Sequence, residues 1–220
     1  MPYPGGKGAS GIYQRLINQI PPHRVYVETH LGGGAIMRHK SQAEVNFGLD
    51  IDPDVIANWK NHPFAQVRQQ DASTFLSEYP LQSDAFVYVD PPYLASTRSS
   101  DRPLYSFEYK EDQHIELLKI LVQLPCMVMI SGYWSELYAE RLSGWRTMTF
   151  QTRTRSGKVA TEWVWMNYPE PAELHDYCFL GEDFRERERI QRRIVRWRSR
   201  LESLPPLERK ALITALAANI

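Results

Sequence analysis

Short apolar runs that alternate with longer amphipathic segments predict an α/β fold. Runs rich in β-branched and aromatic residues, typical of buried parallel strands, occur at residues 25–27, 45–49 and 85–89. Further strands are expected around Val67 and in the second half, at residues 147–152 and 159–166, and an apolar run lies at residues 126–130. The intervening segments carry apolar residues every three or four positions, as at residues 11–20. The pattern therefore predicts a mixed, mostly parallel sheet of about seven strands flanked by helices.

The strand predicted at residues 85–89 ends abruptly in Asp90-Pro91-Pro92-Tyr93. Because proline cannot donate to a sheet ladder, strand pairing stops there and the chain turns. Asp90 and Tyr93 are then held at the carboxyl edge of the sheet, where open α/β folds bind ligands. Seen alone, the same residues also fit a strand end at which Asp90 caps the following segment.

A glycine turn and two acidic residues follow the first two predicted strands. Glu28 ends the first strand, and Gly32-Gly33-Gly34 leads into a helix. Glycine lets the backbone come close to a cofactor, and a helix N-terminus offers free N–H groups to an anion. Asp50 closes the second strand, where an acid suits ribose hydroxyls. Asp52 precedes Pro53 and is the expected helix N-cap, so Asp50 is the expected ribose ligand.

Two further segments are ambiguous by themselves. The opening Tyr3-Pro4-Gly5-Gly6-Lys7 has glycines beside a lysine, which fits either a close approach to an anionic ligand or a flexible terminus. It lacks the spacing of a phosphate-binding P-loop. Asp71 follows the third strand, where it could contact the adenine amino group of a cofactor or cap the next helix.

Composition places the chain among soluble globular proteins. It has 220 residues, a formal net charge of zero and 43% hydrophobic residues, enough for one sizeable core with an appendage. No apolar run is long enough to cross a bilayer, and the first residues lack a secretory signal. The two cysteines are distant from each other, which predicts reduced thiols and a cytoplasmic location. The six histidines show no metal-ligand spacing, so no metal is expected.

The motifs PYPGGK, ETHLGGGA, GLDIDPD, QQDAS and DPPY, in this order, resemble those of the α-class N6-adenine DNA methyltransferases, the Dam-type adenine methylases. The resemblance covers residues 1–168 and implies a Rossmann-like methyltransferase domain. Residues 129–133 and 161–167 look like the closing strands of that family. The resemblance also implies S-adenosylmethionine as cofactor and double-stranded DNA as partner. The implied cofactor-binding residues are Tyr3, Lys7, Glu28, Leu31, Gly32, Gly33, Gly34, Asp50, Asp71 and Asp90.

The chemistry of the DPPY motif fits methylation of an amine. The lone pair of the adenine N6 amine is delocalised into the ring, so the amine is a poor nucleophile. Two acceptors for its hydrogens, the Asp90 carboxylate and the Pro91 carbonyl, would favour a pyramidal nitrogen that faces the methyl group. Tyr93 offers a stacking face to a base flipped out of the duplex. The expected catalytic set is Asp90, Pro91, Pro92 and Tyr93.

The sequence departs from the family in two places. Thr29-His30 stands where the family usually has Pro-Phe, within the glycine motif. Only residues 72–89 separate Asp71 from Asp90, whereas family members commonly insert a target-recognition domain there. The expectation is a short or relaxed target sequence, as in solitary enzymes of the phage or prophage type, without evidence for a restriction partner.

Basic and aromatic residues beside the predicted base pocket are the candidates for DNA contact. They occur in the irregular segment 94–110 and at the turn around Gly157, and a solvated loop is the alternative for both. A third basic group lies in the C-terminal region. The candidates are Arg98, Arg102, Tyr105, Tyr109, Arg153, Arg155, Lys158, Arg192, Arg193 and Arg196.

The chain changes character after residue 168. Residues 169–182 are expected to be a linker, and residues 183–220 an arginine-rich helical hairpin. Eight arginines fall between positions 185 and 200, and an apolar seam runs along the same predicted helix. The arginine face could bind DNA phosphates, the seam could form a homodimer, or the hairpin could pack on its own domain with a solvated charged face.

Three functions remain open at this point. The leading one is methyl transfer to the N6 amine of adenine in DNA. A second is methyl transfer to another planar amine: cytosine N4, an adenine of RNA or a glutamine side chain. The third is a DNA-binding relative that has lost catalysis.

Overall fold

The computed structural model describes residues 6–8, 11–98, 104–153 and 159–218, with only the backbone of residue 153. The chain forms two compact units, Met1–Asp176 and Tyr177–Ile220, and each is considered by itself. The first unit contains the sheet and the pocket, and the second is helical.

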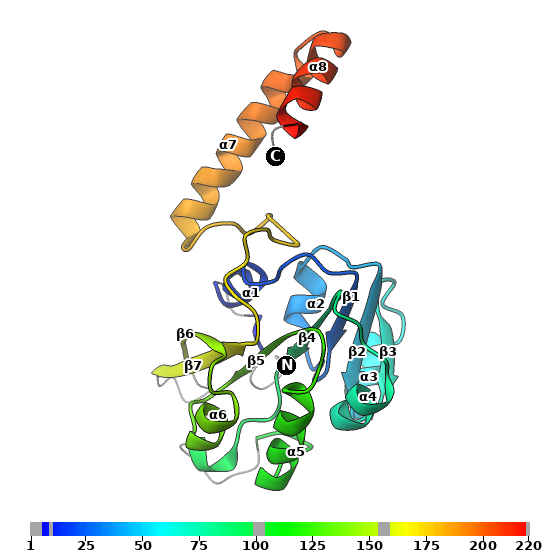
Figure 1. Cartoon of the computed structure of the whole chain (residues 1–220), viewed down its shortest axis with the longest axis vertical. Helices are drawn as coiled ribbons and strands as arrows, with labels where there is room; N and C mark the ends of the chain where they lie inside the picture. The colour runs from blue at the N-terminus through cyan, green and yellow to red at the C-terminus, as the bar shows by residue number, and fades with distance from the viewer. Residues whose placement is uncertain (1–5, 9–10, 99–103, 154–158, 219–220) are drawn as a thin grey trace. The chain divides into compact units, whose positions relative to one another are not determined.

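Within the described residues, seven strands form one sheet in the order β3-β2-β1-β4-β5-β7-β6 (Figure 1). Neighbours from β3 to β5 are parallel, whereas β7 is antiparallel to both β5 and β6. The predicted mixed, mostly parallel sheet is confirmed. The strands are β1 (Val25–Glu28), β2 (Val45–Asp50), β3 (Gln66–Gln69), β4 (Ala85–Val89), β5 (Met127–Gly132), β6 (Arg146–Arg153) and β7 (Val159–Met166).

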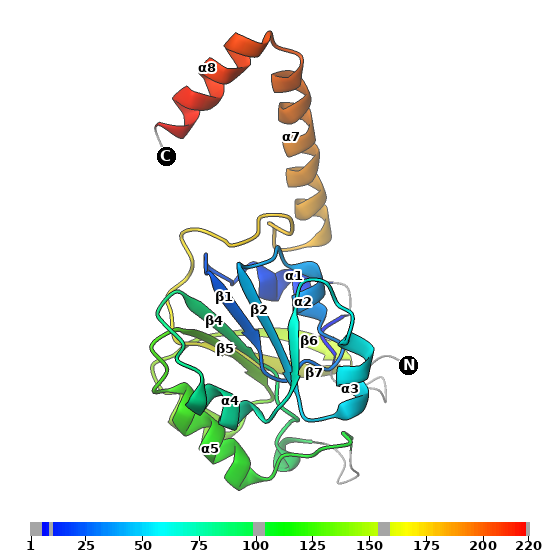
Figure 2. The ribbon, with the colours of Figure 1, turned by 90° about the vertical axis from the view of Figure 1, so that its right-hand side faces the viewer.

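Helices cover both faces of the sheet (Figure 2). On one face lie α1 (Ile12–Ile17), α2 (Ala35–His39) and α3 (Pro53–Trp59), and on the other lie α4 (Ala72–Glu78) and α5 (Glu111–Leu121), with α6 (Glu136–Arg141) beside α5. All five residues of β4 are buried, as expected for a central strand covered on both sides. A short 3-10 helix, η1 (Ala95–Thr97), follows the DPPY motif.

The strand order places the ends of β1, β2 and β4 side by side at one edge of the sheet. β1 pairs with β2 on one side and with β4 on the other. The direction in which successive strands are added to the sheet therefore reverses between β1 and β4. In open α/β sheets the carboxyl edge at such a reversal is where ligands bind. Glu28, Asp50 and Asp90 are therefore brought together although up to 62 positions separate them (90 − 28).

Two of the acids that follow strands, Asp52 and Asp71, are helix caps. Asp52 accepts a hydrogen bond from the amide of Asp54 at 2.9 Å at the start of α3, as expected. Asp71 accepts from the amide of Thr74 at 3.0 Å at the start of α4. Each cap satisfies an amide that the helix leaves without an internal partner.

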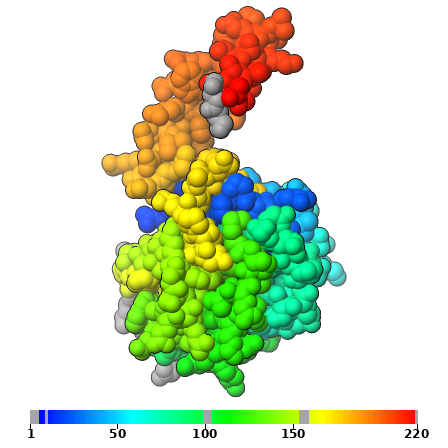
Figure 3. Space-filling view, viewed as in Figure 1, coloured from blue at the N-terminus to red at the C-terminus, as the bar shows by residue number. Residues whose placement is uncertain are grey.

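The first half of the expected linker packs on the first unit. The amide of His175 donates to the carbonyl of Ile20 at 2.9 Å, and the His175 ring stacks on His23 with centroids 3.9 Å apart. Asp176 accepts from the amide of Ser41 at 2.8 Å. Figure 3 shows this segment lying against the N-terminal segment, and the first unit accordingly extends to Asp176.

The second unit is the predicted helical hairpin, α7 (Phe184–Glu202) and α8 (Pro206–Ala217). Asp183 caps α7 by accepting from the amide of Glu186 at 2.8 Å. No side chain of these two described helices is buried. No helix in the described part of the chain is both long and apolar enough to cross a bilayer.

Candidate active site

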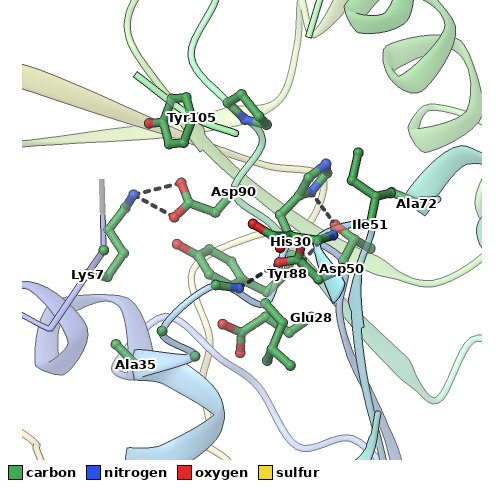
Figure 4. A pocket seen from close by; sticks show the side chains of 18 of the residues that line it. Lys7, Glu28, His30, Ala35, Asp50, Ile51, Ala72, Tyr88, Asp90 and Tyr105 are labelled. Atoms are coloured by element: carbon green, nitrogen blue, oxygen red, sulfur yellow. Dashed lines mark hydrogen bonds and ion pairs between the residues drawn. The ribbon is translucent and has the colours of Figure 1, made fainter. Parts of the chain in front are cut away.

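A pocket opens at the carboxyl edge of β1, β2 and β4, with the glycine loop forming one wall (Figure 4). Most residues predicted to bind a cofactor line it, and Asp71 lies just behind it. Loop residues 105–109 after the DPPY motif supply further walls. The lining includes Lys7, Glu28, His30, Leu31, Gly32, Gly33, Gly34, Asp50, Ile51, Ala72, Tyr88, Asp90, Pro92, Tyr105, Phe107 and Tyr109.

The glycine loop is held in a left-handed conformation and packs tightly against α3. Gly32 has φ 43° and Gly34 has φ 57°, backbone angles that residues other than glycine rarely adopt. A Cβ on Gly34 would lie 2.1 Å from Cζ2 of Trp59, and the Trp59 Nε1 donates to the Gly32 carbonyl at 3.0 Å. The loop therefore has no space for a side chain at Gly34.

Asp50 holds the glycine loop from the end of β2. Its carboxylate accepts from the amide of Gly32 at 2.9 Å and from the amide of Asp52 at 3.0 Å. Burial raises the pKa of Asp50, and these two amide hydrogen bonds oppose the shift. The acid predicted to bind ribose thus also fixes the loop beside it.

Glu28 is buried at the end of β1 and points into the pocket (Figure 4). Its Oε2 accepts from the hydroxyl of Tyr26 and from the amide of Met37, both at 3.0 Å. Burial raises the pKa of Glu28 to about 8, against the effect of these two hydrogen bonds. The pocket therefore contains a carboxyl group that is largely protonated at neutral pH, beside the Asp50 and Asp90 carboxyls.

Asp90 is fixed from two sides. The Lys7 ammonium donates to Oδ1 at 2.6 Å and to Oδ2 at 2.8 Å (Figure 4). The Ser131 hydroxyl on β5 donates to Oδ1 at 2.8 Å. Ser131 also contacts the hydroxyl of Tyr88 at 3.1 Å. Lys7, which opens the chain, is thus brought to the residue that ends β4.

The structure adds a buried carboxylate that the sequence analysis did not select. Glu162 lies on β7, is 4% exposed, and accepts a short hydrogen bond from the Tyr93 hydroxyl. Its Oε2 lies 3.7 Å from the Lys7 Nζ. One signal was available: Glu162, Val164 and Met166 alternate along β7 and all are buried, so a charged residue occupies a core-facing strand position.

Tyr93 is less accessible than the sequence analysis expected. Its side chain is 5% exposed, and its ring packs on Tyr133 with centroids 4.4 Å apart and planes tilted by 46°. The lining of the pocket here comes from Pro92 and Tyr105 instead. A base that stacks on the face of Tyr93 that Tyr133 covers would first have to displace Tyr133, and Tyr105, not Tyr93, lines the pocket here.

Tyr109 and His30 close the pocket near the start of α4. The Tyr109 hydroxyl donates to Oδ2 of Asp71 at 3.4 Å and lies 3.1 Å from Nε2 of His30. Asp71 therefore contacts the pocket through Tyr109 while its other oxygen caps α4. Burial lowers the pKa of His30, so its imidazole is neutral at physiological pH.

The candidate DNA contacts are distributed unevenly. Arg98 donates to the Tyr93 carbonyl at 2.7 Å and forms an ion pair with Glu108, so it braces the loop after the DPPY motif. Tyr105 and Tyr109 line the pocket, and Tyr109 is buried. Arg192, Arg193 and Arg196 are exposed on α7. Tyr3, Arg102, Arg155, Lys158 and the Arg153 side chain lie outside the described residues.

A scan against protein families gives no match to this sequence, and a search of curated proteins gives none either. Solved structures do match. Protein 1320 of Thermoplasma acidophilum is 13% identical, with 76% of this chain and 89% of that chain covered and a TM-score of 0.50. The N-methyltransferase NodS of Bradyrhizobium japonicum is 11% identical, with 72% and 94% covered and a TM-score of 0.47. The 23S rRNA methyltransferase ErmE is 13% identical, with 83% of each chain covered and a TM-score of 0.45.

At these identities the likeness concerns the fold alone. The sheet order with β7 antiparallel between β5 and β6 is that of the Rossmann-like methyltransferase fold. The predicted fold class is therefore confirmed.

Proposed function

We propose that this protein transfers a methyl group from S-adenosylmethionine to the N6 amine of adenine in DNA. The observation that carries the proposal is the position of Asp90. Its carboxylate ends the buried strand β4, faces the pocket, and is held there by Lys7 and Ser131. Proline follows immediately, so the Pro91 carbonyl comes next along the same edge.

The other wall of the pocket suits S-adenosylmethionine. The left-handed glycine loop leaves its backbone open to close contact, and Asp50 stands beside it at the position where an acid suits ribose hydroxyls. The rings of Tyr109 and His30, which line the pocket and contact each other edge to face, provide an aromatic surface for an adenine ring. When bound, the cofactor would supply a methyl carbon on positively charged sulfur.

The residues around Asp90 would then act by positioning and by charge. The Asp90 carboxylate and the Pro91 carbonyl accept the two amine hydrogens and turn the nitrogen lone pair toward the methyl carbon. As the nitrogen–carbon bond forms, the carbon–sulfur bond breaks and its electron pair stays on sulfur. The methylated amine is then positively charged and passes a proton to Asp90. Fixed acceptors of this kind lower the barrier because they need no reorganisation during the reaction.

We also propose that the target sequence is short or relaxed. Residues 72–89 form α4, one turn and β4, which leaves no further element between Asp71 and Asp90 to read bases. Affinity for DNA would then come mainly from phosphate contacts, which carry no sequence information. The exposed arginines of α7 are candidates for such contacts.

Transfer of a tritiated methyl group tests the proposed function directly. Purified protein would be incubated with labelled S-adenosylmethionine and, separately, a random duplex DNA, RNA and protein. We expect label in DNA, in N6-methyladenine spread over many sequence contexts. Asp90→Ala should lower the rate by more than about 100-fold, since it removes the main acceptor for the amine. The exposed Asp112→Ala on α5 is the matched control and should keep the rate within about twofold.

Other outcomes would assign a different substrate. Label in RNA adenine or in cytosine N4 would support methyltransferase activity but assign a substrate other than DNA adenine, because the same acceptor pair fits any planar amine. Label confined to one palindrome of four or more base pairs would contradict relaxed specificity. Absence of binding to S-adenosylmethionine and to its demethylated product, measured by calorimetry, would overturn the whole proposal.

A further inference from the structure

The Lys7 ammonium is hydrogen-bonded to the Asp90 carboxylate, which the proposed reaction needs as an acceptor for the substrate amine. It donates to both Asp90 oxygens, at 2.6 and 2.8 Å. An ammonium N–H and an exocyclic amine N–H make the same kind of hydrogen bond to a carboxylate. An amine that enters the pocket must therefore compete with Lys7 for Asp90.

Glu162 offers a second acceptor within reach of this ammonium. Its side chain is 4% exposed, and Oε1 already accepts from the Tyr93 hydroxyl. Oε2 is buried and has no hydrogen-bond partner in the described part of the chain, although it lies 3.7 Å from Lys7 Nζ. A buried acceptor without a donor is destabilising by about 1–3 kcal/mol, and by more when it is charged. This oxygen is therefore a ready partner for the ammonium in a different position.

The movement required is small. A shift of about 1 Å would bring Nζ to an ordinary charged hydrogen-bond distance from Oε2. The Tyr93 hydroxyl accepts from Nζ at 3.0 Å and donates to Glu162, so it links the ammonium to the second carboxylate. Lys7 could keep this contact in both positions.

The charges favour a mobile ammonium over a neutral amine. Burial by itself would lower the pKa of Lys7, but Asp90 and Glu162 together outweigh it and raise the pKa. Lys7 is therefore charged beside either carboxylate. With the ammonium on Glu162, Asp90 would keep its full negative charge for the amine that becomes positive during methyl transfer.

We propose that Lys7 holds the place of the substrate amine in the free enzyme, and that Glu162 receives the Lys7 ammonium when that amine binds Asp90. The inference rests on the proposed function and assigns a role to two groups of the same site. Glu162 acts through Lys7 and is a positioning residue.

The substitution Glu162→Gln tests this role, because glutamine keeps the shape and an acceptor for Tyr93 but loses the charge. We expect kcat on duplex DNA to fall by about 10- to 100-fold, while the Kd for S-adenosylmethionine stays within about twofold. Glu140→Gln, the same change at an exposed position of α6, should leave both values unchanged. An unchanged kcat for Glu162→Gln would overturn the inference.

A double-mutant cycle separates this role from a structural one. Lys7→Met removes the ammonium and leaves Asp90 permanently open to the amine. In that background Glu162→Gln should change kcat by less than about twofold, because no ammonium remains to be received. A merely structural role for Glu162 would produce the same loss with and without Lys7, and that result would also overturn the inference.

A measurement without turnover distinguishes failure of this inference from failure of the proposed function. The ε-carbon signal of Lys7, in protein with 13C-labelled lysine, is assigned by its loss in Lys7→Met. Adding S-adenosylhomocysteine with duplex DNA, RNA or free cytidine should shift this signal in the wild type for whichever substrate binds, and not in Glu162→Gln. Wild type that methylates DNA without any shift of the signal overturns only the inference. Wild type that methylates only RNA, with the shift present, overturns only the DNA assignment.

Discussion

Gly34 is a position where the wall of the pocket is closely packed. Its left-handed φ of 57° disfavours any side chain, and a Cβ there would lie 2.1 Å from Trp59. Gly144 offers a matched comparison, because its φ of 85° is also left-handed but nothing lies within 4 Å of its ideal Cβ. The two positions separate backbone strain from a steric clash.

We expect Gly34→Ala to destabilise the protein by about 2–4 kcal/mol, from backbone strain together with overpacking against Trp59. Gly144→Ala should destabilise the protein only through backbone strain, by about 1–2 kcal/mol. Because Gly34 belongs to the pocket, its substitution should also weaken binding of S-adenosylhomocysteine by at least about tenfold, and Gly144→Ala should not. Denaturant unfolding and calorimetry measure both effects. Equal losses at the two positions would contradict the packing argument.

At the level of single residues, the sequence predicted groups that follow strands better than groups that act across the sheet. Glu28, Asp50 and Asp90 each end a recognisable strand, so their meeting at one edge follows from the parallel order. Glu162 lies in the middle of β7, and its neighbour Lys7 is 155 positions away (162 − 7). Nothing local in either segment specifies that contact, because it depends on the antiparallel insertion of β7 beside β5.

Among the elements, α7 has the most uneven distribution of charge. Arg185, Arg189, Arg192, Arg196 and Arg200 recur at steps of three or four and are all exposed, so they form one stripe along the helix, with Arg193 next to it. Ile194, Trp197 and Leu201 line a groove that also contains Ile213 of α8. Arg193 also lines this groove, whereas the five arginines of the stripe do not, so the DNA-binding and dimer hypotheses concern neighbouring surfaces that meet at Arg193.

Replacing Arg192, Arg193 and Arg196 with glutamine should weaken binding to duplex DNA and reduce the slope of log K against log salt by about 3, one unit for each lost phosphate contact. The control removes three cations outside the stripe, Arg187, Arg198 and Lys210, and should change the slope by less than about 1. Fluorescence anisotropy at several salt concentrations measures both. An unchanged slope in the stripe variant would exclude phosphate binding by α7 and leave the groove as the candidate interface.

For the whole molecule, the hydrophobic pattern of the sequence predicted the fold but not the details of packing. Strands, helices and the C-terminal hairpin were predictable because each has its own apolar period. The packing of residues 169–176 on the first unit was not, since this segment is rich in proline and acids, and its contacts include single hydrogen bonds and a ring stack with His23. The packing of Tyr133 over Tyr93 also depends on strands that neighbour each other only in space.

Two buried histidines link the stability of the whole protein to pH. His23 is 8% exposed and His114 is 0% exposed. Burial lowers the pKa of His23 to about 3, helped by nearby Lys40, and burial lowers the pKa of His114 to about 4, helped by Arg98. Their Nε2 atoms are buried and have no hydrogen-bond partner in the described residues. Protonation of either ring in the folded protein is therefore unfavourable.

The sign of the pH effect follows from these shifts. In the unfolded chain histidine has a pKa of about 6.5, so between that pH and the folded pKa the unfolded state binds more protons. Each histidine thus contributes stability that is complete above about pH 6.5 and is lost as the pH falls toward 3–4. Glu28 acts in the opposite sense, because its raised pKa of about 8 makes the folded state the one that binds more protons between about pH 4.5 and 8. A change in total stability would therefore mix both effects, and a comparison with single variants is needed.

Between pH 7.5 and pH 5, wild type should lose about 2 kcal/mol more unfolding free energy than His23→Asn, because that variant lacks the proton that His23 takes up on unfolding. His114→Asn should show a similar difference by the same reasoning, although it sits on α5, in a different part of the core. The exposed His39→Asn on α2 is the control and should lose as much as wild type. Urea unfolding at the two pH values gives all four numbers. If the His23 and His114 variants lost as much stability as wild type, protonation of these two rings would not be what limits the protein in acid.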